Sequence, residues 1–223
     1  MKRLMLLPLI MLAVCLTVSV PQAEATITVG TIGAGSNAFP FGGTLQGYPG
    51  TIYQQVYNQA LFPAMSISSV TFFNSFDHVI DGATYTINLS TTTKAVNGLD
   101  TTNLANNVGS DSALLWSGYL SGNPGTSFTF TGTAFNYNPA NGNLLVEILK
   151  NGGSVFTTAD SPSTFDAMNN TFGADSSRAH NFGAGFVNRG LVTQFNAVPL
   201  PGSLLLFGPA LAGLAVIRRR FKK

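Results

Sequence analysis

Few side chains in this sequence could do acid–base chemistry or hold a metal ion. The chain has two histidines, and one of them, His78, lies between Asp77 and Asp81 in "FDHVIDG". Imidazole and carboxylate groups at short spacing raise the hypothesis of a metal or catalytic cluster. The spacing matches no ligand signature, however, and a polar loop between strands is the simpler interpretation.

The second histidine, His180, shares the stretch "ADSSRAHNFG" with Asp175 and Arg178. We interpret this stretch as a loop that exposes its charged groups. A serine or cysteine nucleophile would need a base beside it, and the sequence contains no G-x-S-x-G elbow. The one cysteine, Cys15, lies in the first apolar run, so we expect no thiol chemistry.

Carboxylates supply two further candidates. Glycoside hydrolysis uses a pair of carboxyl groups, and Glu147, within a predicted strand, is the candidate for such a role. The stretch "DSPSTFD" (160–166) is the candidate for calcium binding, although it lacks the EF-hand pattern. Neither pattern is specific enough to define a site. We therefore predict no catalytic residue, no metal site and no cofactor, and we expect that the protein is not an enzyme.

Charge is unevenly placed along the chain. The formal net charge is +2, but residues 26–197 include four basic and eight acidic residues, a net charge of −4. The excess of Lys and Arg therefore lies at the two ends. Nucleic-acid binding depends on clustered cations that neutralise phosphates, and the central residues contain no such cluster. We predict no nucleic-acid partner.

Hydrophobic periodicity places the central residues in strands. Apolar and polar side chains alternate in several short stretches bounded by turn residues, as in "ATYTINLS" (83–90). This pattern predicts an all-β fold, an antiparallel, jelly-roll-like β-sandwich. The predicted strands cover residues 26–32, 51–57, 66–73, 83–90, 113–120, 127–135, 143–150 and 185–195, with a short helical or loop excursion at 99–108.

Aromatic side chains could stack on sugar rings, but a sandwich also needs them to fill its core. Trp116 lies in the largely apolar stretch "ALLWSGYL", and we predict that it belongs to the core. An exposed aromatic side chain whose loss abolishes glycan binding would instead favour a carbohydrate-binding module.

The N-terminal residues have the three parts of a secretory signal peptide. A cationic start precedes an apolar run at residues 4–20, and Ala23 and Ala25 supply an A-x-A cleavage site. We predict a signal peptide over residues 1–25, with cleavage after Ala25. The alternatives are an uncleaved helical anchor and lipidation at Cys15.

The C-terminal residues combine an apolar run with a basic tail. Residues 203–217 would span ~22 Å as a helix, against a bilayer core of ~30 Å, so the segment is short for a membrane span. The basic residues that follow favour the cytoplasmic side and would stop transfer. We predict an exported domain at 26–197, a transmembrane helix at 203–217 and a stop-transfer cluster formed by Arg218, Arg219 and Arg220.

The arrangement of residues 198–223 resembles the PEP-CTERM sorting signal of Gram-negative bacteria, in which a proline motif precedes a short apolar helix and an arginine cluster. The motif matches at Pro199 and Pro201, while Leu200 stands where that family has glutamate. The resemblance implies recognition by exosortase, a membrane-embedded cysteine protease-transpeptidase, and removal of the tail near the motif. The stretch "YQQVYNQALFPAMSISSVTFF" also resembles the extracellular domains found ahead of such tails.

We therefore expect a non-enzymatic protein that the secretion machinery exports and that is sorted to the cell envelope, cell surface or extracellular matrix. The resemblance implies an association with biofilm and with extracellular polysaccharide as a partner. The alternative is a secreted carbohydrate- or surface-binding module, including the ice-binding type, because the same type of tail occurs on proteins of that description. A secreted glycan hydrolase is the weaker alternative.

Overall fold

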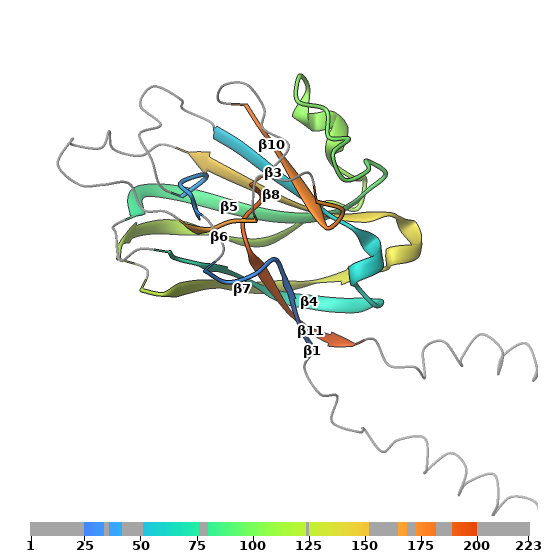
Figure 1. Cartoon of the computed structure of the whole chain (residues 1–223), viewed down its shortest axis with the longest axis horizontal. Coiled ribbons are helices and arrows are strands. Elements are labelled where there is room, and N and C mark those ends of the chain that lie inside the picture. Colours follow the sequence, from blue (N-terminus) through green and yellow to red (C-terminus); the bar gives the residue numbers. More distant parts are fainter. Residues whose placement is uncertain are drawn as a thin grey trace, which may run out of the picture.

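The computed structural model describes residues 25–33, 36–41, 51–75, 80–123, 125–151, 165–168, 173–181 and 189–199. Within these residues, two antiparallel sheets lie face to face as two layers (Figure 1). The prediction of an all-β antiparallel sandwich is confirmed.

The described strands follow one order in each layer. One sheet has the order β1-β11-β4-β7, the other has the order β10-β3-β8-β5-β6, and the short strands β2 and β9 pair separately. The first sheet consists of β1 (Ala25–Val29), β11 (Thr193–Pro199), β4 (Met65–Phe73) and β7 (Ser127–Tyr137). The second consists of β10 (Ser176–His180), β3 (Thr51–Tyr57), β8 (Asn143–Asn151), β5 (Ile80–Thr92) and β6 (Ala113–Gly122). The remaining described elements are β2 (Ser36–Asn37), β9 (Phe165–Asp166) and the 3-10 helices η1 (Gln59–Leu61), η2 (Leu104–Asn107) and η3 (Pro139–Asn141).

Alternation along each strand decides which face a residue takes. In β5, Tyr85, Ile87 and Leu89 are fully buried between the sheets, whereas Thr84 and Thr86 lie on the outer face. A strand of period 2 with one buried face produces this division. Seven of the eight predicted strands correspond to observed strands within three residues at each end, and the predicted strand at 51–57 coincides with β3.

The eighth predicted strand, at 185–195, is displaced. The observed β11 begins at Thr193, and residues 185–188 lie outside the described residues. The strand continues to Pro199 because its last residues pair with β4 beyond a register shift at Asn196 and Ala197.

Aromatic rings fill the space between the sheets. The ring centroid of Phe41 lies 4.8 Å from that of Phe128, 5.3 Å from those of Phe72 and Tyr85, and 5.4 Å from that of Phe165. Tilted and edge-to-face rings at such distances stabilise a core beyond the burial of their apolar area. A chain with one cysteine has no intramolecular disulfide, so this core is the main source of cohesion.

The connection between β5 and β6 covers part of the outer face of the five-stranded sheet (Figure 1). Its Leu99 and Leu104 are buried against Val56, Leu145 and Ala179, which come from β3, β8 and β10. The predicted excursion at 99–108 therefore contains the short helix η2 and forms a second, smaller apolar cluster. The outer face near β6 stays uncovered, since Ser117 and other outward residues of β6 are exposed.

The two sheets meet at one edge, where β6 passes β7. A Cβ atom at Gly132 of β7 would overlap the backbone carbonyl oxygen of Leu115 in β6. Glycine within a strand often marks such a close approach of two backbones. Gly132 thus lets β6 and β7, each at the edge of its sheet, close against each other.

Gly132→Ala should lower the free energy of unfolding by about 1–3 kcal/mol, because the added methyl group forces two backbones apart. Equilibrium unfolding in urea measures the change. Thr133→Val, at an exposed neighbouring position, is the control and should alter the free energy of unfolding by no more than about 0.5 kcal/mol. Equal stability of Gly132→Ala and the wild type would contradict the close approach.

Candidate functional site

Amide and carboxylate side chains form a network on the outer face of the five-stranded sheet. Glu147 of β8 accepts hydrogen bonds from Gln54 Nε2 of β3 (2.8 Å) and from Asn88 Nδ2 of β5 (3.3 Å), one on each carboxylate oxygen. The three residues are opposite one another in adjacent strands. Glu147, the candidate for glycoside hydrolysis, therefore braces three strands of the sheet.

The same network holds the β5–β6 connection on the sheet. Asn107 donates hydrogen bonds to Gln54 Oε1 (2.8 Å) and to the backbone carbonyl oxygen of Asp100 (2.9 Å). The Asp100 carboxylate accepts hydrogen bonds from the backbone N–H of Asn103 (2.8 Å) and from the side chain of Asn106 (2.7 Å). These hydrogen bonds favour the ionised form and hold the pKa of Asp100 below its usual value.

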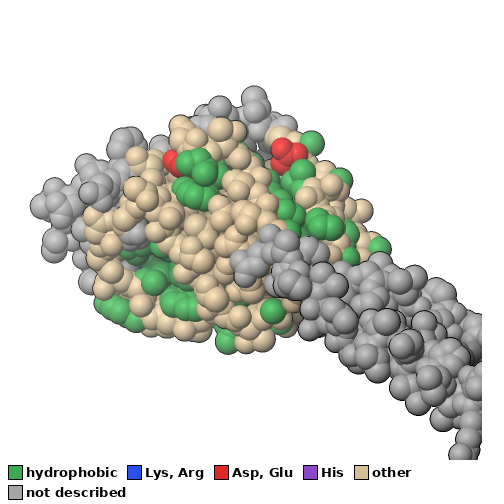
Figure 2. All heavy atoms as spheres, turned by 90° about the horizontal axis from the view of Figure 1, so that it is seen from below, with side chains coloured by type: hydrophobic (Ala, Val, Ile, Leu, Met, Phe, Trp, Pro, Cys, Tyr) green, Lys and Arg blue, Asp and Glu red, His purple; other side chains and the backbone are tan. Residues whose placement is uncertain are grey.

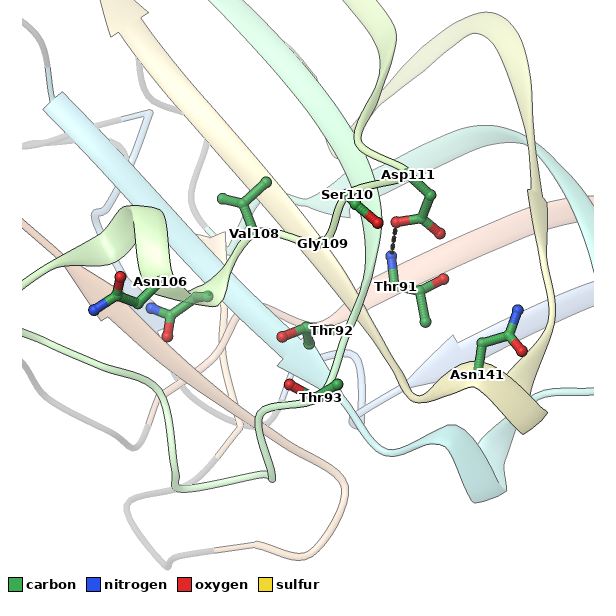
Figure 3. A pocket seen from close by; sticks show the side chains of 10 residues that line it. Thr91, Thr92, Thr93, Asn106, Val108, Gly109, Ser110, Asp111 and Asn141 are labelled. Atoms are coloured by element: carbon green, nitrogen blue, oxygen red, sulfur yellow. Dashed lines mark hydrogen bonds between the residues drawn. The ribbon is translucent and has the colours of Figure 1, made fainter.

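A polar pocket of about 490 Å³ lies beside this connection (Figure 3). Its walls are residues 91–93 at the end of β5, residues 106–111 of the connection, and Asn141 of η3. The Asp111 carboxylate accepts a hydrogen bond from the backbone N–H of Thr91 (2.8 Å), which joins two of the walls. Hydroxyl and amide groups dominate the lining, which includes no Lys, Arg or His. Such a pocket suits a neutral, hydroxyl-rich ligand better than an anion.

One aromatic ring on this face is exposed, and sequence reasoning missed it. Tyr119 of β6 lies opposite Thr84 of β5 and is exposed. Trp116 is partly buried and packs against the core, with its ring centroid 4.8 Å from that of Phe130, in agreement with the prediction that it packs there and does not form an exposed platform. Alternation along β6 could have revealed Tyr119, because residues an odd number apart in a strand lie on opposite faces.

The prediction of an exposed loop around His180 is wrong for most of that segment. Residues 176–180 form β10, and Arg178 and His180 are both 3% exposed. Arg178 lies beside Tyr53, and the His180 ring lies against that of Phe39, with centroids 6.2 Å apart. Asp175, just before the strand, is exposed. Pairing with β3 draws "SSRAH" into the sheet, since backbone hydrogen bonds form whatever the polarity of the side chains.

Burial controls the protonation of the polar groups between the sheets. Loss of solvation raises the pKa of Tyr53 to about 12, against the opposing effect of the Arg178 charge, and lowers the pKa of the Arg178 guanidinium. The Tyr53 hydroxyl donates to Gln55 Oε1 (2.7 Å). Gln55 also bonds the backbone of Leu191, accepting from its N–H (2.8 Å) and donating to its carbonyl oxygen (2.9 Å). This buried group joins β3 to the residues before β11.

The other predicted candidates lie only partly within the described residues. Asp166, the last residue of "DSPSTFD", lies in β9 and accepts hydrogen bonds from Ser75 Oγ (2.6 Å) and from the backbone N–H of Gly33 (2.8 Å). Among the residues that the structure describes, no three side chains of His, Cys, Asp or Glu come together to hold a metal ion. The candidates that lie outside the described residues are 160–164, Asp77, His78 and the side chain of Asp81.

Gln54→Ala should loosen the β5–β6 connection. The substitution removes a shared partner of Asn107 and Glu147, and an orphaned polar group of this kind costs about 1–3 kcal/mol of stability. Urea unfolding measures the loss, and amide hydrogen exchange should rise most in residues 99–108. Gln194→Ala, which removes a half-buried, outward-facing glutamine of β11, is the matched control and should have a smaller effect. Unchanged exchange in the connection would contradict the bracing role.

Tyr53→Phe should make the protein less sensitive to alkaline pH. In the unfolded chain the tyrosine ionises near its ordinary pKa of 10, whereas folded Tyr53 keeps its proton to about 12. Stability that is fully present below pH 10 is therefore lost as the pH rises towards 12, by roughly 1.4 kcal/mol per pH unit for this group. The variant should show a shallower decline in the free energy of unfolding over this range.

At about pH 8, Tyr53 keeps its proton in both the folded and the unfolded wild type. The difference in free energy of unfolding between the variant and the wild type at this pH therefore gives the cost of the lost hydrogen bond to Gln55. Unfolding monitored by tryptophan fluorescence at several pH values gives both the decline in stability above pH 10 and the cost of the hydrogen bond. Parallel declines for the variant and the wild type above pH 10 would show that Tyr53 does not contribute to the alkaline transition.

The predicted targeting segments meet the described residues at two strand ends. The strand β1 begins at Ala25, and β11 ends at Pro199. Within the described part of the chain, no helix is both long and apolar enough to cross a membrane. The predicted residues beyond these ends lie outside the described residues, namely Ala23, Leu200, Pro201, the helix 203–217, Arg218, Arg219 and Arg220. A comparison of the chain with family models, curated proteins and solved structures finds no match.

Proposed function

We propose that the protein is an exported, non-enzymatic component of the cell envelope, cell surface or extracellular matrix. In this proposal the secretion machinery exports the chain through its signal peptide, and an exosortase-type transpeptidase recognises the C-terminal signal of the PEP-CTERM type. The observation that carries the proposal is the three-part arrangement of residues 198–223, joined without a linker to a folded β-sandwich.

The position of the strand ends supports attachment of the domain at one point. The first strand pairs with the last, so that Ala25 lies opposite Ala197 (Figure 1). Both predicted targeting segments would therefore leave the sandwich from neighbouring positions. A domain tethered in this way keeps the outer faces of its sheets available to the matrix while the C-terminal segment is in the membrane.

The distribution of charge supports a partner other than nucleic acid. Of the four basic residues in the described part of the chain, Lys150 and Arg178 are buried, at 6% and 3% exposure. Figure 2, which views the molecule from the side of the four-stranded sheet, shows no Lys or Arg side chain among the described atoms on that face. Phosphate binding needs such cations at the surface. A surface with few exposed cations is better suited to a partner such as extracellular polysaccharide.

The roles of the candidate catalytic groups support a non-enzymatic assignment. Both carboxylate oxygens of Glu147 accept hydrogen bonds from amide side chains, and these bonds brace the sheet. His180 lies inside the sandwich and presents no ring to solvent. A general acid or base needs access to a substrate proton. The His180 ring is buried, and the half-buried Glu147 carboxylate is held by two amide donors of the sheet.

We also interpret the topology as jelly-roll-like. Without β10, the sheets have the orders β1-β11-β4-β7 and β3-β8-β5-β6, with all neighbours antiparallel and with successive strands crossing repeatedly between the layers. Eight strands arranged as two Greek keys define that architecture. In this interpretation, β10 is an additional strand at the edge beside β3.

The sorting proposal predicts the ends of the mature protein. Mass spectrometry of the surface-localised protein from an exporting Gram-negative cell should give a chain that begins near Thr26 and lacks the basic residues from Arg218 onward. A variant in which Arg218, Arg219 and Arg220 are all replaced by Gln should retain its tail, because the charges that stop transfer are removed.

Mature surface-localised protein that still contains Lys223 would contradict processing of the tail. Protein that stays soluble in the cytosol with its N-terminal residues intact would contradict export altogether.

A further inference from the structure

The ring of Tyr119 lies across the surface of the five-stranded sheet. Its exposed fraction is 67%, larger than those of Ile32 (55%) and Leu114 (51%), the other exposed large apolar side chains in the described residues. A Cβ atom at Gly82 of β5 would overlap the Tyr119 hydroxyl and would lie 3.1 Å from its Cζ. The tip of the ring therefore occupies the space that a side chain at position 82 would fill. The ring tip thus lies over Gly82 of β5, and most of the side chain is open to solvent.

Hydroxyl side chains occupy neighbouring positions on the same face. Thr84, directly opposite Tyr119, is exposed, and the Thr86 and Ser117 hydroxyl oxygens of the next outward pair lie 3.0 Å apart. Each hydroxyl has one donor and two acceptor positions, so the Thr86–Ser117 pair can still bond a ligand after bonding itself. Adjacent strands lie about 4.8 Å apart, so these hydroxyls are within reach of a molecule stacked on the ring.

Among the described residues, the surroundings of Tyr119 are unfavourable for two other kinds of partner. Residues 113–122 of β6 include no charged side chain, so an anionic polymer would find no cation there. A peptide that adds to the sheet as a strand needs a free edge. The edge of β6 is closed at Leu115, where the backbone of Gly132 in β7 approaches it. An aromatic platform with neutral hydroxyl neighbours is suited to a molecule with an apolar face and hydroxyl groups at its rim.

We propose that the outer face of β5 and β6 binds a neutral polysaccharide, with Tyr119 as the platform on which a sugar ring stacks. The hydroxyl groups of Thr84, Thr86 and Ser117 bond the hydroxyl groups of that sugar. Gly82 is a positioning residue, because its missing side chain lets the tyrosine ring lie along the sheet. The site deepens the proposed function and rests on it for the extracellular setting, while binding itself is a property of the isolated protein.

The polar pocket extends this site along the same pair of strands. Thr92, which also lines the pocket, is eight residues from Thr84 in β5 and so lies on the same face of the strand, at a distance of about 26 Å. Leu114, half exposed, and the Asn88 side chain lie between the ring and the pocket. A polysaccharide that runs along β5 and β6 therefore contacts Tyr119 at one end and the hydroxyl-lined pocket at the other. Oligosaccharides should consequently compete for the site better than the corresponding monosaccharide.

The test is affinity electrophoresis of the full-length chain in mild detergent, through native gels that contain laminarin, dextran or galactomannan, with anionic alginate as the comparison. The wild type should be retarded by a neutral polysaccharide. Tyr119→Ala should weaken that binding by about tenfold or more, because the stacking surface is lost. Tyr119→Phe keeps the ring and should retain most of the affinity.

Two further variants test whether binding depends on the position of the Tyr119 ring or on exposed apolar area in general. Gly82→Val should weaken binding although Tyr119 is still present, since the new side chain displaces the ring. Ile32→Ala removes another exposed apolar side chain, located beyond β1, and should bind as the wild type does. Circular dichroism shows whether each variant is folded, and the pair Tyr119→Ala and Tyr119→Phe decides the question if Gly82→Val does not fold.

Several results would overturn the site. They are failure of the wild type to bind any of the three neutral polysaccharides, retardation by alginate alone, and equal binding by Tyr119→Ala and the wild type. Binding that survives Tyr119→Ala but is lost in Thr131→Ala, at an exposed position of β7, would place the surface on the four-stranded sheet instead. Each of these results is independent of the chain ends found by mass spectrometry, so the site and the sorting proposal fail separately.

Discussion

The packing of two aromatic-rich inner faces is the constraint on which the rest of this structure depends. Without a disulfide, the domain is held together by apolar area buried between its sheets, with Phe41 at the centre of a group of rings. Because side chains alternate between the two faces of a strand, the residues next to each inward-pointing ring point outward. In β5, burial of Tyr85 and Ile87 places Thr84 and Thr86 outside. The neutral, hydroxyl-rich outer face is thus the counterpart of the core.

The hydrogen-bond network on the five-stranded sheet then divides that outer face into two parts. Gln54 and Asn107 hold the β5–β6 connection over β3, where Leu104 completes a small apolar cluster. The connection covers the side of the sheet next to β10 and leaves the side next to β6 open. The exposed ring of Tyr119 lies on the open side, and the polar pocket lies where the connection meets β5. Removal of a single amide at Gln54 would therefore affect the boundary of the proposed binding face as well as stability.

Local sequence patterns were sufficient to predict most strands but not the long-range contacts. The segment 51–57 is rich in β-branched and aromatic residues, and it forms β3 as predicted. The segment "SSRAH" has no apolar alternation and contains a charge, so its pairing with β3 as β10 could not be inferred from its own residues. The same limit applies to the candidate site. Alternation could have placed Tyr119 outside, but its position over Gly82 depends on the register between β5 and β6, and that register includes two irregularities.

A domain with so few charges must protect its sheet edges by geometry. Exposed strand edges are templates for pairing with other chains, and many proteins protect them with lysine or proline. Here β6 contains no charged residue, and β7 instead covers its edge near Leu115 through the close approach at Gly132. At the opposite side of the sandwich, the edge strands β1 and β10 are only five residues long each. Short edges limit pairing because each added strand would gain few backbone hydrogen bonds. These devices leave the faces of the sheets, and not their edges, as the surfaces through which this domain meets its surroundings.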